Sequence, residues 1–348
     1  MKVTAIYVYP IKALRPIRLD AAKLTSQGVQ WDRRFMIWRV DDDDPSKLTK
    51  IQIDKQHDCG LFKQEIVGDK VEVTYLTPAK PVVPFHPQQQ VILEVPLSPD
   101  ISALETVELD LHLSSVKAYK MGSHYDDWFS ACFGVKAALI YIGDGRRPVL
   151  GTYAPRVDDP QEQRGRLSTL SSRVTGTLGP TKVKPWITFT DLAPFLVATE
   201  KSLANVRTRL AASDNNVEMT AFRPNIVIDG DKDFDEDFWT ELSAHGAPLL
   251  RLTKMCNRCP SLNVDYNTGR LAEGERGTVL KKLMSDRRVD EGAKFQPVFG
   301  KYAFLHEQQE GMVLSVGDDI HVSQRAEERP VFDWPLRSRG AQPQYYQP

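Results

Sequence analysis

The chain has 348 residues, of which 41% are hydrophobic and 26% are charged, a composition typical of globular proteins. Its 45 basic and 46 acidic side chains give a net charge of −1, so the overall charge does not favour nucleic acid or an anionic membrane. No apolar run approaches the roughly 20 residues of a membrane-spanning helix, and the start, MKVTAIYVYP, alternates like a strand rather than a signal peptide. Four cysteines in this length make no disulfide framework. We therefore predict a protein of a reducing compartment, most simply the cytoplasm.

The first third of the chain is predicted to be β-structure. The acidic run at 41–45 is predicted to be a solvated hairpin tip, with an acidic docking patch as the alternative. The proline-rich residues 77–90 are predicted to be a surface loop. Short β-rich segments separated by turn residues predict a small barrel or sandwich. These segments are VTAIYVYPIK, RRFMIWRV, SKLTKIQI, KVEVTYL, QVILEVPL and TVELDLHL.

The pattern changes near residue 125. YDDWFSACFG has apolar residues at helical spacing and precedes the apolar strand AALIYIG. Residues 144–184 form a long polar stretch, which is typical of a lid, a binding loop or an insertion. PWITFTDLAPFLVATEKSLANVRTRLAAS then predicts a strand, a turn and a helix with Thr199 as its N-cap.

The remaining segments alternate between strands and short helices. We predict strands at NIVIDG and PLLRLTK, with a short aromatic helix, FDEDFWTEL, between them. A cysteine loop follows, then a charged helix around 277–290 and the strands YAFLHEQ and DDIHVS. The whole pattern predicts an α+β fold that is rich in β-structure.

The segment LLRLTKMCNRCPSLNVDYNTG holds Cys256 and Cys259 in a Cys-x-x-Cys unit. A structural zinc site needs four Cys or His ligands, and no His-x3–5-His pair accompanies these two. A thioredoxin-like redox pair opens a helix, whereas Pro260 and its successors predict a strand and a turn. Two interpretations stay open: small, partly buried residues at a strand end, or one thiolate on a soft transition metal whose other ligands come from a cofactor.

The metal interpretation predicts cations and amide groups that hold a large anionic cofactor. Lys12 follows the first strand, and Arg33 and Arg34 open the next one. Arg223 and Asn225 stand at the entrance of the apolar strand NIVIDG. Arginine can bind phosphate through two parallel N–H hydrogen bonds, and asparagine can both donate and accept hydrogen bonds at the edge of a heterocycle. Each residue alone is common on protein surfaces, but together they favour a cofactor site.

Seven motifs occur in an order that resembles a known family. They are YPIK, DRRFMI, TDLAPFLVATEKSL, FRPNIVIDG, CNRCPSLNVDYNTG, FQPVFGKYAF and SVGDDIHV. This order resembles the MOSC (molybdenum cofactor sulfurase C-terminal) proteins with an N-terminal MOSC β-barrel region, and more narrowly the amidoxime-reducing component family. The resemblance implies a β-barrel region at 1–125 and a MOSC domain at 126–323, built on a β-barrel with flanking helices. Residues 324–348 are predicted to be a flexible tail.

The resemblance also implies a molybdenum cofactor, in which a pterin dithiolene and one protein cysteine hold the metal. The family pattern makes Cys259 the metal ligand and catalytic residue, with Cys256 as a packed neighbour. The same matching gives the cofactor-binding residues Lys12, Arg34, Arg223 and Asn225 for the pterin and its phosphate, Thr190, Asp191 and Thr253 along the pocket, and Arg258 in the loop. Ala13 departs from the pattern, which often has a hydroxyl residue there. The stretches 77–90 and 144–184 are longer than the family core needs.

The implied activity is reduction of N-hydroxylated compounds such as amidoximes and hydroxylamines. The sequence has no Rossmann fingerprint and no four-cysteine ferredoxin pattern, so electrons come from an external donor, which the resemblance suggests is cytochrome b5 with its flavin reductase. The basic stretch KKLMSDRR either docks this donor or is a solvated helix face. The alternative function is a carrier of the cofactor or of sulfur, and a third is a scaffold without cofactor. The resemblance allows mitochondrial association, although we see no anchor in the sequence. It also allows membership of a family that is described as binding pyridoxal phosphate.

Overall fold

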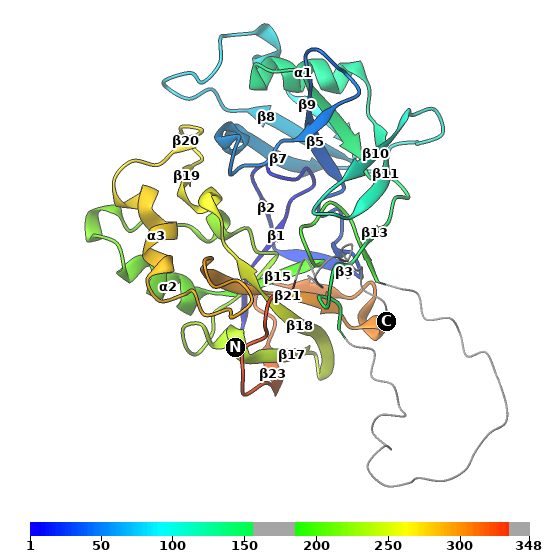
Figure 1. The fold of residues 1–348 in the computed structure, drawn as a ribbon. Helices are drawn as coiled ribbons and strands as arrows, with labels where there is room; N and C mark the ends of the chain where they lie inside the picture. The colour runs from blue at the N-terminus through cyan, green and yellow to red at the C-terminus, as the bar shows by residue number, and fades with distance from the viewer. Residues whose placement is uncertain (156–184, 334–348) are drawn as a thin grey trace, which may run out of the picture.

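The computed structural model describes residues 1–155 and 185–333 (Figure 1). Strands dominate this part of the chain, which confirms the predicted β-rich α+β class. Most of the long polar stretch at 144–184, and the tail from residue 334 onward, lie outside the described residues. None of the helices in the described ranges is long and apolar enough to cross a membrane.

The largest sheet in the described ranges combines strands from both ends of the chain (Figure 1). In sheet order, its eight strands are β2 (Ile17–Leu19), β1 (Val3–Val8), β16 (Ile226–Ile228), β15 (Phe195–Thr199), β21 (Val298–Leu305), β18 (Ala247–Asn257), β17 (Trp239–Ala244) and β23 (Ile320–Arg325). A smaller sheet also combines strands from both ends of the chain. It contains β22 (Val313–Ser315), β3 (Ala21–Thr25) and β4 (Gly28–Val29). The beginning of the chain is therefore built into the sheets of the C-terminal half.

The N-terminal half contributes two further sheets. One contains β10 (Thr106–Asp110), β11 (Ser115–Lys120), β12 (Ala137–Tyr141), β5 (Phe35–Val40) and β6 (Leu48–Lys50). The other contains β7 (Phe62–Val67), β8 (Lys70–Tyr75) and β9 (Leu93–Pro96). Helix α1 (Ser123–Phe133) covers them and contributes Trp128 and Phe133 to the core around Phe62. Since β12 lies beyond residue 125 but pairs with β5, the predicted boundary at 125 stays a prediction.

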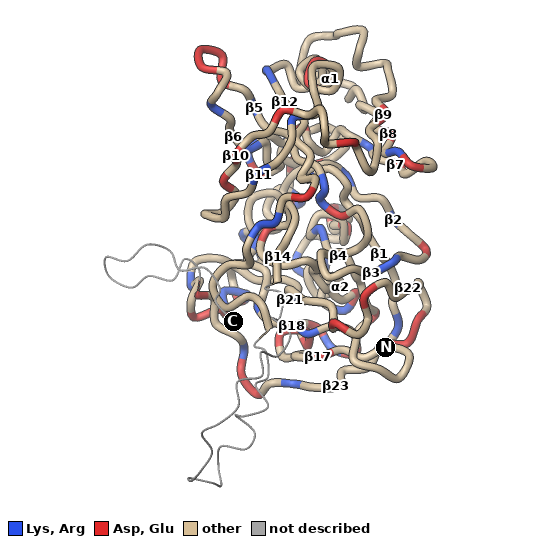
Figure 2. The backbone as a smooth tube through the Cα atoms, turned by 90° about the vertical axis from the view of Figure 1, so that its right-hand side faces the viewer, with Lys and Arg blue, Asp and Glu red and all other residues tan. Residues whose placement is uncertain are grey.

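Two loop predictions for this half are confirmed. The acidic run at 41–45 joins the antiparallel strands β5 and β6 as a hairpin tip, which forms a red loop beyond these strands in Figure 2. The proline-rich stretch at 77–90 lies on the surface, where Phe85 is 67% exposed, and ends in the 3-10 helix η2 (Pro87–Gln90).

The helices of the C-terminal half lie beside the large sheet (Figure 1). Helix α2 (Glu200–Thr208) begins as predicted, because the Thr199 hydroxyl accepts a hydrogen bond from the Ser202 amide at 3.1 Å. The charged helix expected around 277–290 is shorter: η7 (Glu275–Thr278) leads into α3 (Val279–Met284). The remaining short 3-10 helices are η1 (His57–Leu61), η3 (Ala212–Asp214), η4 (Met219–Phe222), η6 (Pro260–Asn263) and η8 (Glu307–Gln309). Two short strand pairs complete the described elements. In the first, β13 (Arg147–Pro148) pairs with β14 (Trp186–Ile187), and in the second, β19 (Val264–Asp265) pairs with β20 (Arg270–Leu271).

The prediction of an aromatic helix at FDEDFWTEL is wrong. Only Asp235–Phe238 forms a 3-10 helix, η5, and Trp239 begins strand β17. This strand pairs with β18 on one side and with β23 on the other. The sheet therefore satisfies the backbone on both edges and overrides the helical spacing of the aromatic residues.

Glu236 of η5 gives a prediction for the pH dependence of stability. Its buried carboxylate accepts hydrogen bonds from Ser202 Oγ at 2.9 Å and Thr199 Oγ1 at 3.2 Å. Burial raises the pKa of Glu236 to about 7, although the Ser202 hydrogen bond lowers it. A carboxyl with a raised pKa in the folded state stabilises the fold below its unfolded pKa, and this stabilisation is lost as the pH rises to about 7.

We expect Glu236→Gln to become more stable relative to the wild type as the pH rises, by about 3 kcal/mol above pH 7. Urea unfolding at pH 5, 6, 7 and 8 measures the difference. Glu65→Gln, at an exposed position of β7, is the control and should show no such trend. A constant difference between Glu236→Gln and the wild type across this range would contradict the prediction.

Candidate functional site

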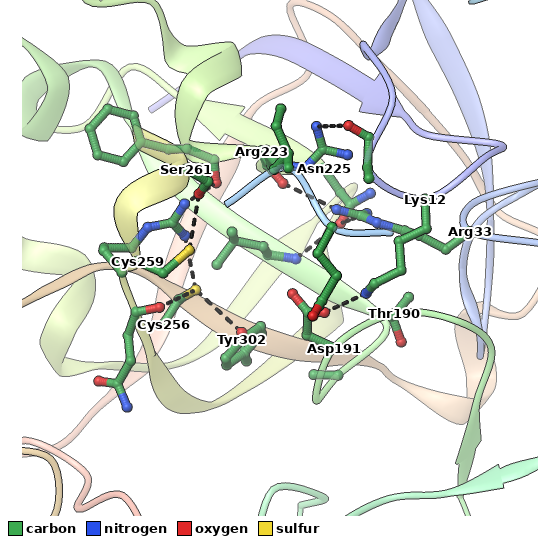
Figure 3. Close-up of a pocket in the computed structure, with 18 of the residues that line it drawn as sticks. Lys12, Arg33, Thr190, Asp191, Arg223, Asn225, Cys256, Cys259, Ser261 and Tyr302 are labelled. Atoms are coloured by element: carbon green, nitrogen blue, oxygen red, sulfur yellow. Dashed lines mark hydrogen bonds and ion pairs between the residues drawn. The ribbon is translucent and has the colours of Figure 1, made fainter. Parts of the chain in front are cut away.

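A cavity of about 130 Å³ lies where the two halves of the chain meet (Figure 3). Segments that are distant in sequence line it: the residues after β1, those before β5, those before β15, and the loop after β18. Seven of the nine predicted site residues come together there, namely Lys12, Thr190, Asp191, Arg223, Asn225, Arg258 and Cys259. The other two, Arg34 and Thr253, do not line the cavity.

The cysteine loop begins at the irregular end of β18. The pairing of β18 with β21 shifts register twice, between Leu252 and Met255 and between Met255 and Asn257. Such bulges re-aim side chains and are common beside functional sites. Cys256 is buried, whereas Cys259 is exposed and its Sγ lies 3.1 Å from Ser261 Oγ. The β18 end therefore presents one accessible thiol.

The residues after Cys259 differ in part from the prediction. The short 3-10 helix η6 follows Cys259 directly, because Pro260 fixes a backbone angle that suits the first helical position, and the expected strand and turn come after it, beginning with β19. Within the described ranges, no group of three or more His, Cys, Asp or Glu side chains is arranged to hold a metal ion.

Cys256 is more than a packed neighbour. Arg258 Nη1 donates a hydrogen bond to its Sγ at 2.9 Å, and the Tyr302 hydroxyl lies 3.3 Å from the same sulfur. The other end of the guanidinium donates to the Phe222 carbonyl at 3.0 Å. Burial raises the pKa of Tyr302 well above its ordinary value, so the phenol keeps its proton. Sequence analysis did not identify Tyr302, whose only local signal is its place in the FQPVFGKYAF motif.

The opposite wall of the cavity is cationic and is organised by Tyr9. The guanidinium groups of Arg33 and Arg223 lie 4.2 Å and 4.4 Å from the centre of the Tyr9 ring. Both arginines have left-handed backbones, with φ of 46° and 56°. The Tyr9 hydroxyl donates to the Pro224 carbonyl at 3.1 Å, which fixes the ring. A buried aromatic ring thus holds two positive charges close together.

The arginine of the DRRF motif that faces the cavity is Arg33, not Arg34. Arg34 Nη2 donates instead to the Tyr141 hydroxyl at 3.2 Å and to the Gly143 carbonyl at 2.7 Å. Both residues precede β5, and Arg33 has a left-handed backbone at this turn. Thr253 lies in β18, and its buried Oγ1 has no hydrogen-bond partner among the described residues.

Asn225 lines the cavity, but its amide is already used by the protein. Its Oδ1 accepts from Arg33 Nη1 at 3.1 Å and from the Leu196 amide at 3.2 Å. Its Nδ2 donates to the Tyr7 carbonyl at 3.3 Å. The geometry therefore makes Asn225 a residue that positions Arg33.

Lys12 and Asp191 form the polar corner of the cavity, with Thr190 beside them (Figure 3). Lys12 is 7% exposed, donates to the Phe189 carbonyl at 2.7 Å and forms an ion pair with Asp191. Burial lowers the pKa of Lys12 to about 8, against the attraction of Asp191. Burial would raise the pKa of Asp191, but Lys12 and His112 together hold it well below its ordinary value. The pair is therefore ionised at neutral pH.

A buried arginine that sequence analysis missed supports this corner. Arg147 has no exposed surface and donates from Nη1 to the carbonyls of Thr188 and Thr190, each at 2.7 Å. Its Nη2 donates to the Leu111 carbonyl at 2.9 Å. Arg147 thus ties the segment before β15 to the β10–β11 hairpin of the other half. Arg147 lies inside the polar stretch that was predicted to be a loop, so sequence analysis gave no reason to expect a buried arginine there.

The lowered pKa of Lys12 predicts pH-dependent anion binding. Lys12 loses its charge above about pH 8, so we expect the cofactor-free protein to bind sulfate up to about tenfold more weakly at pH 9 than at pH 7. Calorimetric titration measures the affinity. Lys12→Arg keeps its charge and should remove most of this dependence. Equal pH dependence in Lys12→Arg and the wild type would contradict the assignment.

The residues of the cavity fit a large anionic cofactor with a metal that accepts a soft ligand. Four cations, Lys12, Arg33, Arg223 and Arg258, line it beside two carboxylates. Among the described residues, no hydrogen-bond partner exists for the buried atoms Arg223 Nη2, Arg258 Nε and Thr190 Oγ1. A buried polar group without a partner costs about 1–3 kcal/mol, which an acceptor in the cavity would offset. The exposed Cys259 adds a soft donor.

Comparisons with known proteins identify the domains that this chain resembles. Residues 1–136 match the MOSC N-terminal beta barrel domain and residues 184–321 match the MOSC domain. Mitochondrial amidoxime-reducing component 1 of Mus musculus is 24% identical over 326 residues, 92% of this chain and 82% of that protein. Its Homo sapiens counterpart is 35% identical over 143 residues, 40% of each chain. Molybdenum cofactor sulfurase of Bos taurus is 22% identical over 82% of this chain, which corresponds to 29% of that protein.

Proposed function

Because the chain joins a MOSC N-terminal beta barrel domain to a MOSC domain and so belongs to the MOSC-domain proteins, we propose that it is a molybdenum-cofactor-dependent oxidoreductase. Its substrates are N-hydroxylated compounds, and its electrons come from an external donor. The observation that carries the proposal is the exposed Cys259 thiol in a cavity whose opposite wall is cationic. The names of the mouse, human and bovine relatives agree with this activity and cofactor.

Each residue of the cavity has a role in this proposal. Cys259 is the protein ligand of the metal, because its thiol is the accessible one. Arg33 and Arg223 bind the pterin phosphate, and Lys12 binds a polar edge of the pterin. Asn225 holds Arg33 in position. When bound, the cofactor supplies the two-electron chemistry that removes oxygen from an N–O bond.

The proposed reaction consumes two electrons and two protons. A hydroxylamine R–NH–OH becomes R–NH2 and water, and an amidoxime becomes the amidine and water. Tyr302 and Arg258 lie in the cavity as hydrogen-bond donors, and they stabilise negative charge that develops on the departing oxygen. A one-electron donor of the cytochrome b5 type, itself reduced by a flavin reductase, supplies the electrons in two steps.

The docking surface predicted at KKLMSDRR needs correction. Lys281 and Arg288 are exposed, but Arg287 is buried and forms an ion pair with Asp237. Lys282 pairs with Glu275. The stretch therefore offers fewer free charges than its sequence predicts, and the donor interface stays a prediction.

Turnover by the purified, cofactor-loaded protein tests the proposal. With NADH, cytochrome b5 and its reductase, we expect benzamidoxime to be converted to benzamidine. A parallel assay uses reduced methyl viologen in place of cytochrome b5. This assay detects the activity even if cytochrome b5 is not a suitable electron donor for this protein. Cofactor-loaded protein that forms no benzamidine with either donor would contradict the proposal.

The second candidate function is a carrier of the cofactor or of cysteine-bound sulfur, favoured by the similarity to a molybdenum cofactor sulfurase. It uses the same Cys259 and the same cations but needs no turnover. A persulfide on Cys259, detected by mass spectrometry in protein that reduces no N-hydroxylated substrate, would favour the carrier. The mouse and human relatives are named mitochondrial, and mitochondrial association and a cytoplasmic location both stay predictions.

A further inference from the structure

The cavity has one wall that the proposed cofactor contacts do not use. Gln52, Ile53 and Asp54 follow β6 in the N-terminal half and line the cavity with the cysteine loop. The side chains of Gln52 and Asp54 form no hydrogen bond or ion pair with any residue in the described ranges. Their carboxamide and carboxylate are therefore available to a ligand.

Asp54 differs in this respect from the other charged residues of the cavity. Lys12 and Asp191 neutralise each other, and Arg33 pairs with Asp32. Arg223 donates to the Leu14 carbonyl at 3.0 Å. Arg258 donates to Cys256 and Phe222. On a mostly cationic lining, Asp54 is thus a negative charge without a partner among the described residues, on the side that belongs to the N-terminal half.

The chemistry of this wall selects a particular kind of group. A carboxylate accepts two parallel N–H bonds from an amidinium or guanidinium group, and this charge-assisted pairing is among the stronger hydrogen-bonding arrangements. The Gln52 carboxamide can accept a further N–H or donate to a hydroxyl oxygen. Buried Ile53 and Phe222 line the same cavity and offer apolar surface to a hydrocarbon or aryl group. The like-charged arginines would repel such a cation if it approached from their side.

We infer that Asp54, assisted by Gln52, selects N-hydroxylated substrates that carry an amidinium or guanidinium group over neutral N-hydroxy compounds such as hydroxamic acids. The inference rests on the proposed function and names its substrate class. An N-hydroxyguanidine takes two electrons from the heme-type donor and two protons, its N–O bond breaks, and water leaves. The guanidinium product keeps its positive charge and so retains its contact with Asp54.

Binding of a product analogue tests the inference without turnover. In calorimetric titrations of the full-length, cofactor-loaded protein, we expect benzamidine to bind about tenfold more tightly than its neutral isostere benzamide. Asp54→Asn should remove this preference, and Asp54→Glu should restore part of it. Asp42→Asn, at the exposed hairpin tip, removes one negative charge elsewhere and should keep the preference. Benzamidine affinity that is unchanged in Asp54→Asn would overturn the inference.

Turnover separates this inference from the proposed function. The ratio of kcat/KM for an N-hydroxyguanidine to that for benzohydroxamic acid should fall about tenfold in Asp54→Asn. An unchanged ratio in an active enzyme overturns the selection by Asp54 and leaves the proposed function standing. Benzamidine binding that depends on Asp54, in a protein that reduces no substrate, supports the cation site and contradicts the reductase.

Discussion

Cys259→Ala is expected to lose at least about 100-fold in kcat/KM for benzamidoxime, because it removes the proposed protein ligand of the metal. The side chain is exposed, so its loss leaves no cavity in a core. We therefore expect the thermal unfolding of the cofactor-free protein to change little. Reductase assays and thermal unfolding of the same preparations distinguish a lost ligand from a lost fold.

Cys132→Ala is the matched control for this substitution. Cys132 is a buried thiol in the core of the N-terminal half, and burial raises its pKa to about 12. It does not line the cavity. The variant should retain turnover. Equal losses in Cys259→Ala and Cys132→Ala would show that the effect is not specific to the cavity thiol.

Arg287→Met is expected to lower the free energy of unfolding by about 3–5 kcal/mol, because it leaves the buried Asp237 carboxylate with one partner fewer. Arg287 Nη2 lies 2.9 Å and 3.0 Å from the two oxygens of Asp237, and both side chains are at most 4% exposed. The guanidinium also lies 3.8 Å from the centre of the Phe234 ring. Arg329 contacts the same carboxylate at 2.8 Å but is one-third exposed, so it compensates only in part.

Urea unfolding at pH 7 measures this effect. Arg288→Met is the control, because Arg288 is adjacent in sequence and exposed, and it should change stability by less than about 0.5 kcal/mol. Adding Asp237→Leu to Arg287→Met should recover part of the loss, since it removes the buried charge that lacks its partner. A change below about 1 kcal/mol in Arg287→Met would show that the ion pair does not stabilise the fold.

The local patterns of the N-terminal half predicted several of its strands, because strand alternation and turn residues are read within a few positions, but they did not identify β2, β3, β7 or β11. β1, β5, β8 and the hairpin at 41–45 all lie where they were expected. The partner of β1 could not be predicted in this way. Its pairing with β16 joins residues more than 200 positions apart, and no local pattern encodes such a contact.

The candidate site was predicted in composition but not in orientation. The motifs identified the residues that converge on the cavity, and the DRRF motif gave Arg34 where the structure gives Arg33. Arg33 has a left-handed backbone, and its amide donates a long-range hydrogen bond to the Tyr9 carbonyl at 2.8 Å; sequence spacing reveals neither feature. Tyr9 itself looked like an ordinary strand residue, although it holds both arginines.

The aromatic segment at FDEDFWTEL shows why the helix prediction failed. Its aromatic and acidic residues have a spacing that fits one face of a helix, but Trp239 and Leu242 are buried in a strand between two partners. Propensity is a weak guide where a sheet supplies hydrogen bonds on both edges. Gln52 and Asp54 were missed for another reason: they lie in an irregular loop whose relation to the cavity depends on how the two halves meet.

Molybdenum and pterin content, measured per chain in the native protein and in Cys259→Ala, tests the central assignment most directly. Metal analysis by mass spectrometry and fluorescence of the oxidised pterin give the two numbers independently of turnover. We predict near one molybdenum and one pterin per chain in the native protein. In Cys259→Ala, we predict a large loss of molybdenum. Equal molybdenum content in the two proteins would contradict the assignment of Cys259 as the metal ligand.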